Sequence, residues 1–590
     1  MKKYVVFLAL LFLILSACVS EPEQPTPVPT VKLTETPEAT AVFTSTPTQT
    51  PRPTLTPFPT NTPIPPTQTP SPLETGSNGY PWWNDVVFYE VFVRSFYDSN
   101  GDGVGDINGL IERLDYLNDG DPTTTDDLGV TGIWLMPVMV SPSYHGYDVT
   151  DYYRIDPEYG TNEDFKRLMD EAHKRGIRVV VDLVLNHTGV GHPWFAESKD
   201  PSSDRRDWYL WETTRPTWRG PDGQIVWHPD GSNDQYYYGV FWDGMPDLNY
   251  ENPDVTAEMY ETTRFWLEEM GVDGFRLDAI KHMIEVDTAQ ENTFPTHDWL
   301  EAYYDFYKSV DPYAFTVGEA WTATQQVLEY TGDEVDIAFQ FDLALDILNG
   351  SDAGIAQIFT KTQQEVIDTF PSNQYATFIT NHDQNRVMTQ LDGDEGKARV
   401  AASILLTGTG VPFIYYGEEI GMIGKKPDED IRRPMQWQSD NIRVGFTTGI
   451  PWRIPAQDYE ERSVALQEDD PDSLLNHYKA LIQLRNEHEA LRVGDWQLVE
   501  ANSGRLYTFL RYTDNETILV IINLNRNPAT AENYSLELES SPLTGDEIPT
   551  LLYGQAIEGD LQIDTNGGFS GYTPIEEVAP QSVTIILLEK

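Results

Sequence analysis

The sequence predicts an α/β fold, a (β/α)8 TIM barrel with a domain inserted in one loop, followed by a C-terminal antiparallel β-sandwich. Short apolar runs alternate eight times with helical patterns, which is typical of parallel strands joined by helices. Several runs end in a carboxylate, and barrel enzymes carry their reactive groups at the C-terminal ends of strands. After Gly494 the pattern changes to short alternating runs separated by polar turns, which predicts the sandwich.

The barrel elements follow in order along the chain. One connecting helix spans Thr161–Arg175, where Asp164 completes a capping box. Another begins after Asn252 at Pro253 and stops at Gly271. The predicted strands are Val86–Val93, Ile133–Met136, Arg178–Leu185, Gly274–Asp278, Ala314–Glu319, Asp336–Phe339, Tyr375–Thr380 and Val411–Tyr416.

The chain divides into four predicted parts. Residues 1–18 form a lipoprotein signal peptide, 19–78 a Pro/Thr-rich stalk, 79–493 the catalytic barrel and 494–590 the sandwich. A long gap separates strands three and four. Since structureless loops of that length are uncommon in compact domains, we expect the gap to contain an inserted domain at about 187–245. We expect its tryptophans to divide between a small core and a cleft wall; they are Trp194, Trp208, Trp211, Trp218, Trp227 and Trp242.

The N-terminus predicts export and a lipid anchor. Two lysines precede an apolar stretch that is too short for a comfortable membrane span. The stretch ends in Leu15-Ser16-Ala17-Cys18, which resembles the bacterial lipoprotein cleavage box, and Cys18 is the only cysteine. Lipid on Cys18 would hold the protein at the cell envelope, facing the exterior, on an extended stalk. The alternative is an ordinary signal peptide with an incidental cysteine.

The net charge of the chain limits the classes of partner that it can bind. The formal net charge is −55, from 94 acidic and 39 basic residues. This excess argues against nucleic acid, whose phosphates require a basic face, and against an electrostatic hold on anionic lipid. The negative charge neither favours nor disfavours the binding of a neutral polysaccharide. The sequence leaves the oligomeric state open, with a monomer favoured.

Three carboxylates carry the predicted chemistry. Asp278, Glu319 and Asp383 each follow a short apolar run. If these runs are parallel strands, the three side chains lie together at the C-terminal end of the barrel. Retaining glycoside hydrolysis needs two carboxyl groups about 5 Å apart, one as nucleophile and one as acid/base. The alternative role for such strand-end carboxylates is as helix caps or ion pairs.

The protonation states follow from the neighbours of these carboxylates. Arg276 lies two residues before Asp278, so both side chains face one side of the strand and the guanidinium would keep Asp278 ionised. Glu319 would need a raised pKa, which burial near the other carboxylates would supply.

Together with Asp182–His187, these segments resemble the four conserved regions of the α-amylase family, glycoside hydrolase family 13, from roughly Gly79 to the C-terminus. The resemblance implies that Asp278 is the nucleophile, Glu319 the general acid/base and Asp383 the transition-state stabiliser. It also makes the insertion domain B, one wall of the cleft. The substrate-binding residues that it implies are Tyr147, His187, Arg276, Lys281, His282, His382 and Arg386.

An acidic loop after the first strand predicts a calcium site. Its oxygen ligands stand at the spacing that begins an EF-hand loop, although Gly109 occupies the position of the final glutamate. The same loop binds calcium in oligo-1,6-glucosidase-like members of the family. The alternative is a solvated acidic turn. The predicted ligands are Asp98, Asn100, Asp102, the Val104 carbonyl and Asp106.

The resemblance implies a second calcium ion between domain B and the barrel. Its ligands would include Asn186, Asp247 and the His282 carbonyl, while the sequence does not place the remaining ligand.

The remaining motifs favour one activity. Met245–Asn249 resembles the fifth conserved region of the family. Its sequence is intermediate between those of the oligo-1,6-glucosidase and neopullulanase groups and resembles the intermediate group, which contains bacterial α-amylases. Ala279 beside the nucleophile accompanies α-1,4 preference in relatives. We therefore predict a retaining α-amylase acting on starch and maltooligosaccharides. The alternatives are a cyclomaltodextrinase or neopullulanase, an α-glucosidase or oligo-1,6-glucosidase, and, from another class, a non-catalytic surface glycan-binding protein.

Overall fold

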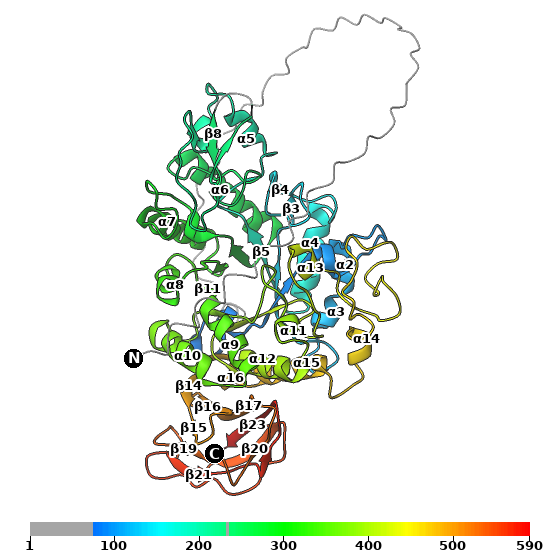
Figure 1. The fold of residues 1–590 in the computed structure, drawn as a ribbon, viewed down its shortest axis with the longest axis vertical. Coiled ribbons are helices and arrows are strands. Elements are labelled where there is room, and N and C mark those ends of the chain that lie inside the picture. The colour runs from blue at the N-terminus through cyan, green and yellow to red at the C-terminus, as the bar shows by residue number, and fades with distance from the viewer. Residues whose placement is uncertain (1–74, 232–234, 590) are drawn as a thin grey trace, which may run out of the picture. The chain divides into compact units, whose positions relative to one another are not determined.

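The computed structural model describes residues 75–231 and 235–589 (Figure 1). The signal peptide, Cys18 and nearly all of the stalk predicted from the sequence lie outside the described residues. Among the helices of the described part, none has the length and hydropathy needed to cross a membrane.

Eight parallel strands form the predicted barrel. Their order in the sheet is β11-β10-β9-β5-β2-β1-β13-β12. A parallel bridge between Phe339 and Ala376 joins the two edges of this sheet, so the barrel is nearly closed. The eight predicted strand runs are therefore confirmed, with shorter ladders: β1 (Phe88–Val91), β2 (Gly132–Leu135), β5 (Arg178–Leu183), β9 (Gly274–Leu277), β10 (Phe315–Gly318), β11 (Ile337–Ala338), β12 (Ala376–Thr377) and β13 (Val411–Tyr415).

The barrel interior is a packed aromatic core. Phe88 of β1 stacks on Phe413 of β13 with ring centroids 4.6 Å apart, and Phe315 of β10 lies 5.3 Å from Phe88. These rings are fully or almost fully buried, together with Trp134 of β2. Because aromatic side chains bury large areas, this cluster fixes the strands against one another and sets the positions of their C-terminal ends.

The helices between the strands begin and end as the sequence indicates. Thr161 caps α4 (Asn162–Lys174), and its capping box with Asp164 is formed. Asn252 caps α6 (Pro253–Arg264), which continues as a π-helical turn to a left-handed Gly271. Other helices around the barrel are α2 (Ile107–Glu112), α3 (Leu114–Leu117), α7 (Phe294–Val310), α8 (Thr324–Tyr330), α9 (Phe341–Ala353), α10 (Gln357–Thr369), α11 (Val387–Gln390), α12 (Glu395–Thr407) and α15 (Leu474–Glu487).

The insertion contains a small antiparallel sheet in the order β6 (Trp211–Glu212), β8 (Tyr236–Tyr238) and β7 (Trp227–Pro229). Its tryptophans differ in burial. Trp194, Trp208 and Trp227 are buried, the first two in the main hydrophobic cluster and Trp227 in a small cluster of the insertion, whereas Trp242 is 48% exposed. The exposed aromatic pair Phe241 and Trp242 therefore belongs to the surface of the insertion.

The C-terminal region is the predicted antiparallel domain. Its main sheet runs β14 (Asp495–Leu498), β16 (Leu506–Tyr512), β17 (Thr517–Asn523), β23 (Ser582–Glu589) and β20 (Ile548–Tyr553). A smaller sheet runs β15 (Glu500–Ala501), β19 (Leu536–Leu538) and β21 (Phe569–Tyr572). Buried side chains of both sheets share one hydrophobic cluster, as in a sandwich.

Two buried arginines, one from the barrel and one from this domain, meet at the junction between them. Arg485 of α15 donates to the carbonyls of Leu406, Gly408 and Gly410, at distances of 2.7 to 3.1 Å. Arg511 of β16 donates to the carbonyl of Thr407 at 2.9 Å. The C-terminal carbonyls of α12 are thus satisfied by cations, which also complement the negative end of the helix dipole.

Candidate active site

Two of the predicted catalytic carboxylates, Asp278 and Glu319, directly follow β9 and β10 and share one arginine, and the third, Asp383, lies on the segment that follows β12. Arg276, 1% exposed, places Nη1 2.6 Å from Asp278 Oδ1 and Nη2 2.8 Å from Glu319 Oε2. One rigid guanidinium therefore bridges the two carboxyl groups that were predicted to act as nucleophile and acid/base. Nη1 also lies 2.8 Å from Asp182 Oδ1, so Arg276 is shared among three carboxylates.

Asp383 is held from two sides. Arg432 Nη2 lies 2.7 Å from Asp383 Oδ1, and His382 Nε2 lies 3.3 Å from Asp383 Oδ2. His382 is fixed in turn by Glu90 of β1, whose Oε1 is 2.5 Å from His382 Nδ1. The carboxylate is therefore pinned by a cation and by an imidazole with a defined orientation.

Tyr147 and His187 form the neighbouring wall. The Tyr147 ring stacks on His382 with centroids 5.6 Å apart, and its hydroxyl lies 2.7 Å from His382 Nε2 and 3.0 Å from Asp182 Oδ2. His187 Nδ1 lies 3.1 Å from Asn186 Oδ1, while its Nε2 is buried without a hydrogen-bond partner among the described residues. Such an orphan nitrogen beside the carboxylates is available for a ligand hydroxyl.

The turn after the nucleophile candidate is conformationally unusual. Ala279 has φ of 52°, in the left-handed region that residues other than glycine rarely enter. Its N–H donates to Glu319 Oε2 at 3.1 Å. The turn thus sends the chain sharply away from the end of β9 and ties Asp278 and Glu319 together through the backbone.

The opposite wall carries the next pair of predicted substrate residues. Lys281 Nζ lies 2.7 Å from Glu291 Oε2 and donates to the Trp321 carbonyl at 2.9 Å. His282 Nδ1 is 2.8 Å from the Gln290 carbonyl, and Phe241 of the insertion packs against the rings of both His187 and His282. The insertion therefore reaches two of the histidines that were predicted to bind substrate.

Arg386 has different surroundings from those expected of a substrate ligand. Its Nε donates to the Ile431 carbonyl at 2.8 Å and its Nη1 to the Tyr416 carbonyl at 2.6 Å. The side chain is 2% exposed and lies over the ring of Tyr415. The structure thus engages Arg386 with the main chain, while Arg432 supplies the cation that touches Asp383.

The electrostatics separate the carboxylates. Burial, with the nearby charges of Asp278 and Asp383, raises the pKa of Glu319 to about 7 against the opposing effect of Arg276. Burial also acts to raise the pKa of Asp383, but His382, Arg432 and Arg276 outweigh it and lower this pKa to about 2. At neutral pH the site therefore combines a carboxyl group that can hold a proton with one that stays ionised, the combination that acid catalysis beside a stabilising carboxylate needs.

This pattern predicts the alkaline limb of the pH profile. A general acid works while protonated, so kcat/KM should be full below the pKa of Glu319 and fall about tenfold per pH unit above about 7. This decrease in kcat/KM should be smaller for an aryl glycoside whose leaving group departs without protonation. Burial raises the pKa of Asp182 to about 7 as well, so the titration belongs to the carboxylates around Arg276 jointly. A profile that stays flat to pH 9 with a poor leaving group would contradict this assignment.

Sequence reasoning missed three residues that organise the site. Asp182, inside β5, binds Arg276 and Tyr147; Glu90, inside β1, orients His382; Arg432 holds Asp383. The first two carried a usable signal, since each is a lone charge in an apolar strand run and a buried charge needs a partner. Arg432 lies in an irregular segment, where no periodicity points to it.

The acidic loop 98–106 folds as a compact turn. Asp98 Oδ1 accepts the N–H groups of Asn100 and Gly101 at 3.0 and 2.7 Å, and its Oδ2 accepts that of Gly103 at 2.7 Å. Asp106 accepts from Ser99 and caps α2, whereas Asp102 is exposed. Among the residues that the structure describes, no group of three or more His, Cys, Asp or Glu side chains converges as a metal site.

The second set of predicted ligands does come together. Asn186 Nδ2 donates to the His282 carbonyl at 2.7 Å and lies 3.5 Å from Asp247 Oδ2. Burial and the charge of Glu285 raise the pKa of Asp247 well above its usual range. Burial raises the pKa of Glu285 to about 8, and its Oε1 has no hydrogen-bond partner in the described chain. Glu285 is thus a neighbouring oxygen donor that no sequence motif indicated.

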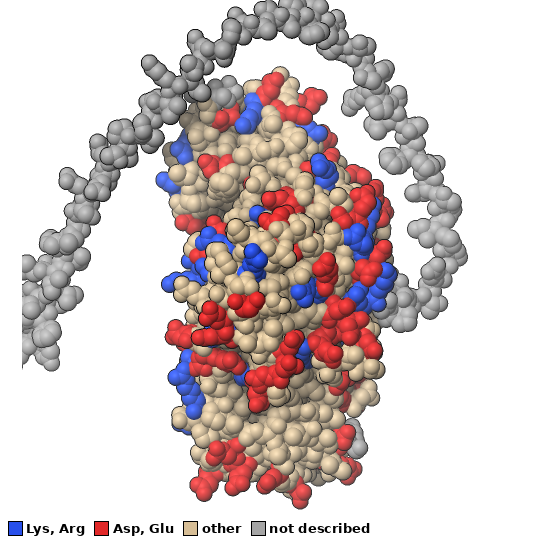
Figure 2. Space-filling view, turned by 90° about the vertical axis from the view of Figure 1, so that its right-hand side faces the viewer, with Lys and Arg blue, Asp and Glu red and all other residues tan. Residues whose placement is uncertain are grey.

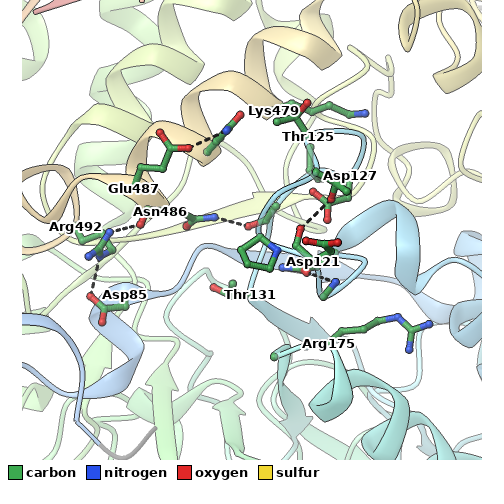
Figure 3. Close-up of a pocket in the computed structure, with 18 residues that line it drawn as sticks. Asp85, Asp121, Thr125, Asp127, Thr131, Arg175, Lys479, Asn486, Glu487 and Arg492 are labelled. Carbon is green, nitrogen blue, oxygen red and sulfur yellow. Dashed lines mark hydrogen bonds and ion pairs between the residues drawn. The ribbon is translucent and has the colours of Figure 1, made fainter. Parts of the chain in front are cut away.

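A separate hollow lies at the other end of the barrel. Its volume is about 510 Å³, and it is lined by residues that precede β1, β2 and β5 and by α15 (Figure 3). Arg492 pairs there with Asp85 at 3.1 Å, and Asn486 binds the Gly129 carbonyl at 2.7 Å. None of the predicted site residues lines it. The face shown in Figure 2 mixes acidic and basic side chains without a continuous basic area.

Comparison with known proteins agrees with this geometry. The family described as "Alpha amylase, catalytic domain" matches residues 90–494. Alpha-amylase 3 of Dictyoglomus thermophilum is 40% identical over 475 residues, covering 79% of this chain and 90% of the relative. An oligo-1,6-glucosidase of Heyndrickxia coagulans is 34% identical over 553 residues, covering 79% and 96%. The crystal structure of an α-amylase from H. orenii has a TM-score of 0.73 at 40% identity, covering 85% of this chain and 99% of that one.

Proposed function

The chain belongs to the α-amylase family and is a glycoside hydrolase, and on that premise we propose that it hydrolyses the α-1,4-glucosidic bonds of starch and maltooligosaccharides with retention of configuration. The observation that carries the proposal is the sharing of Arg276 between Asp278 and Glu319, which puts two carboxyl groups at one point, and the pKa of Glu319 is raised to about 7 there by burial. The name of the Dictyoglomus relative supports the α-amylase specificity.

The proposed reaction proceeds in two displacements. Asp278 attacks the anomeric carbon while Glu319 donates its proton to the departing glycosidic oxygen, giving a covalent glycosyl ester on Asp278. Glu319, now a carboxylate, then takes a proton from water, and that water attacks the anomeric carbon and frees Asp278. Asp383 and the buried His187 Nε2 are placed to bind the hydroxyls of the distorted sugar.

The proposal is tested by product analysis on three substrates. Soluble starch should give maltooligosaccharides whose first-formed anomer is α by proton NMR, while cyclodextrin and isomaltose should react at least about tenfold more slowly in kcat/KM. Faster hydrolysis of isomaltose would instead assign an oligo-1,6-glucosidase, the activity named for the Heyndrickxia relative. An initially β product would refute the double displacement.

We propose calcium as the structural ion of this enzyme. The donors in the loop 98–106 are carboxylate, amide and carbonyl oxygens, the set that a hard cation prefers, and those around Asn186, Asp247 and Glu285 are of the same kind. Calcium at these positions would neutralise buried carboxylates and hold domain B against the barrel. The chain's own contribution is a run of Asx turns at Asp98, Asn100 and Asp102, in which each side-chain oxygen accepts the N–H group two residues further on.

Chelation is expected to lower the melting temperature. An ion that binds only the folded state at about 100 times its Kd adds about 2.7 kcal/mol, so its removal should shift the melt by several degrees. Asp102→Ala should reproduce much of that shift, and Asp115→Ala, which removes an exposed carboxylate paired with Arg175, should not. If neither chelation nor Asp102→Ala changes the melting temperature, the loop 98–106 holds no structural calcium ion.

We also propose that the mature protein is anchored by lipid on Cys18 and faces outward on its Pro/Thr-rich segment. Support comes from the short signal, the lipoprotein-like box and the single cysteine. Cys18→Ala should release the enzyme from the membrane fraction with its kcat unchanged. Recovery of the unmutated protein without lipid, wholly in the medium, would overturn the anchor and leave the enzymatic proposal untouched.

A further inference from the structure

A small cavity is enclosed by residues of the segment after β12 and of α11, α12, β13 and α15. Its volume is about 10 Å³, the size that admits a single water molecule. Much of its lining is apolar, from Val387, Met388, Ala398 and Met422. Five side chains with polar groups also line it, and three of them, Thr380, Arg386 and Glu418, determine what it can hold.

Each of the three polar side chains directs a buried atom that lacks a hydrogen-bond partner in the described chain. The atoms are Thr380 Oγ1, Arg386 Nη2 and Glu418 Oε2, on side chains 2%, 2% and 6% exposed. A buried polar atom without a partner costs about 1–3 kcal/mol, so three around one cavity call for a common partner. The other oxygen of Glu418 is already taken by the Tyr478 hydroxyl at 2.8 Å.

Water is the species whose hydrogen bonds match this arrangement. Its oxygen can accept from Arg386 Nη2, and its two hydrogens can be donated to Glu418 Oε2 and Thr380 Oγ1. A cation would meet the Arg386 guanidinium, and an anion would meet the Glu418 carboxyl group. The volume leaves no space for a larger neutral ligand.

The rest of Arg386 connects this cavity to the catalytic carboxylate. Nε binds the carbonyl of Ile431, the residue before Arg432. Arg432 then reaches Asp383 Oδ1 with Nη2 at 2.7 Å and the His382 carbonyl with Nε at 2.9 Å. From the other direction, Thr380 stands three residues before Asp383 on the same segment. The cavity therefore joins both segments that hold the Asp383 carboxylate.

We propose that Arg386, together with one internal water bound to Thr380 and Glu418, is a positioning residue that sets the place of Asp383, and that it does not touch the substrate. The inference rests on the proposed function of Asp383. Loss of the guanidinium would free the water and leave the Ile431 carbonyl with the Tyr415 hydroxyl, at 3.1 Å, as its donor, so Arg432 and Asp383 would shift by a fraction of an ångström. Since a displacement of about 1 Å can lower a rate about 100-fold, the effect should appear in kcat.

The test compares Arg386→Met with Arg485→Met. Both remove a buried guanidinium bound to main-chain carbonyls, but Arg485 lies at the junction with the C-terminal domain. Arg386→Met should lower kcat about 10- to 100-fold on maltooligosaccharides with KM within about twofold. Arg485→Met should lower the melting temperature and leave kcat per folded molecule unchanged. Thr380→Val, which keeps the shape and removes one partner of the water, should lower kcat about three- to tenfold.

A crystal structure at high resolution gives a readout that does not depend on activity. It should show one water within hydrogen-bond distance of the three atoms in the unmutated enzyme. An empty cavity, an unchanged kcat in folded Arg386→Met, or an effect on KM alone would each overturn the inference. If the unmutated enzyme hydrolyses no α-glucan, the proposed function fails, while the crystal structure still tests the water site.

Discussion

Asp278→Asn should lower the hydrolysis of starch about 10⁴-fold or more while the protein stays folded. Asparagine keeps the shape of the side chain but cannot form the glycosyl ester, and removal of a covalent nucleophile generally leaves only residual catalysis from binding and electrostatics. Arg276 would keep its contacts with Asp182 and Glu319, so the melting temperature should change little. Initial rates and a thermal melt on the same preparation measure both quantities.

Glu319→Gln should behave differently, and the difference identifies the roles. A general acid contributes about 10²- to 10⁴-fold, and an activated leaving group makes its proton unnecessary. Glu319→Gln should therefore regain much of its first-step rate with an aryl glycoside of low leaving-group pKa, whereas Asp278→Asn should not. Asp336→Asn is the matched control, because Asp336 is buried just before β11 and pairs with Lys308 at 2.7 Å. It should lower stability without lowering kcat, and equal losses in all three variants would contradict the assignment.

Arg276→Met should destabilise the fold by about 3–5 kcal/mol and abolish measurable activity. The substitution leaves Asp182, Asp278 and Glu319 around one point without a cation, and a buried charge that loses its partner is strongly destabilising. Chemical denaturation at pH 7.5 measures the loss. Arg443→Met is the control, because Arg443 is an exposed arginine.

The loss in Arg276→Met should depend on pH in a defined direction. Asp182 and Glu319 already have pKa values of about 7, so acidification protonates them at little cost and the deficit should shrink below pH 7. Asp182→Asn in the Arg276→Met background should recover part of the stability, because one uncompensated carboxylate is gone. A loss below about 1 kcal/mol at pH 7.5, or one independent of pH, would show that Arg276 is not the shared counter-ion.

Much of the fold could be predicted from the sequence because its signals are local. The capping box at Thr161 and the Asn252-Pro253 start depend on neighbouring residues, and both are formed. The strand ladders are shorter than the apolar runs because barrel strands pair only where their stagger brings them into register. The catalytic carboxylates follow directly from strand ends, which explains why their gathering could be anticipated.

The partners of those carboxylates could not be predicted with the same ease. Arg432, Glu90 and Glu285 are brought to the site by the closure of the barrel and by loops, over separations that no periodic pattern reports. Arg386 illustrates the opposite failure. The family resemblance placed it among the substrate-binding residues, but its side chain binds main-chain carbonyls. Sequence spacing gives proximity along the chain, while the direction of a side chain depends on the tertiary fold.

Covalent trapping tests the central claim most directly. Incubation with a fluorinated α-glucosyl fluoride, which slows the second displacement, should leave one glucosyl unit on the enzyme. Mass spectrometry of a digest should place that unit on the peptide that contains Asp278, and Asp278→Asn should carry none. An adduct on Glu319 or Asp383 would assign the nucleophile to another residue. Turnover of starch with no trappable ester, together with a β first product, would contradict the double-displacement mechanism altogether.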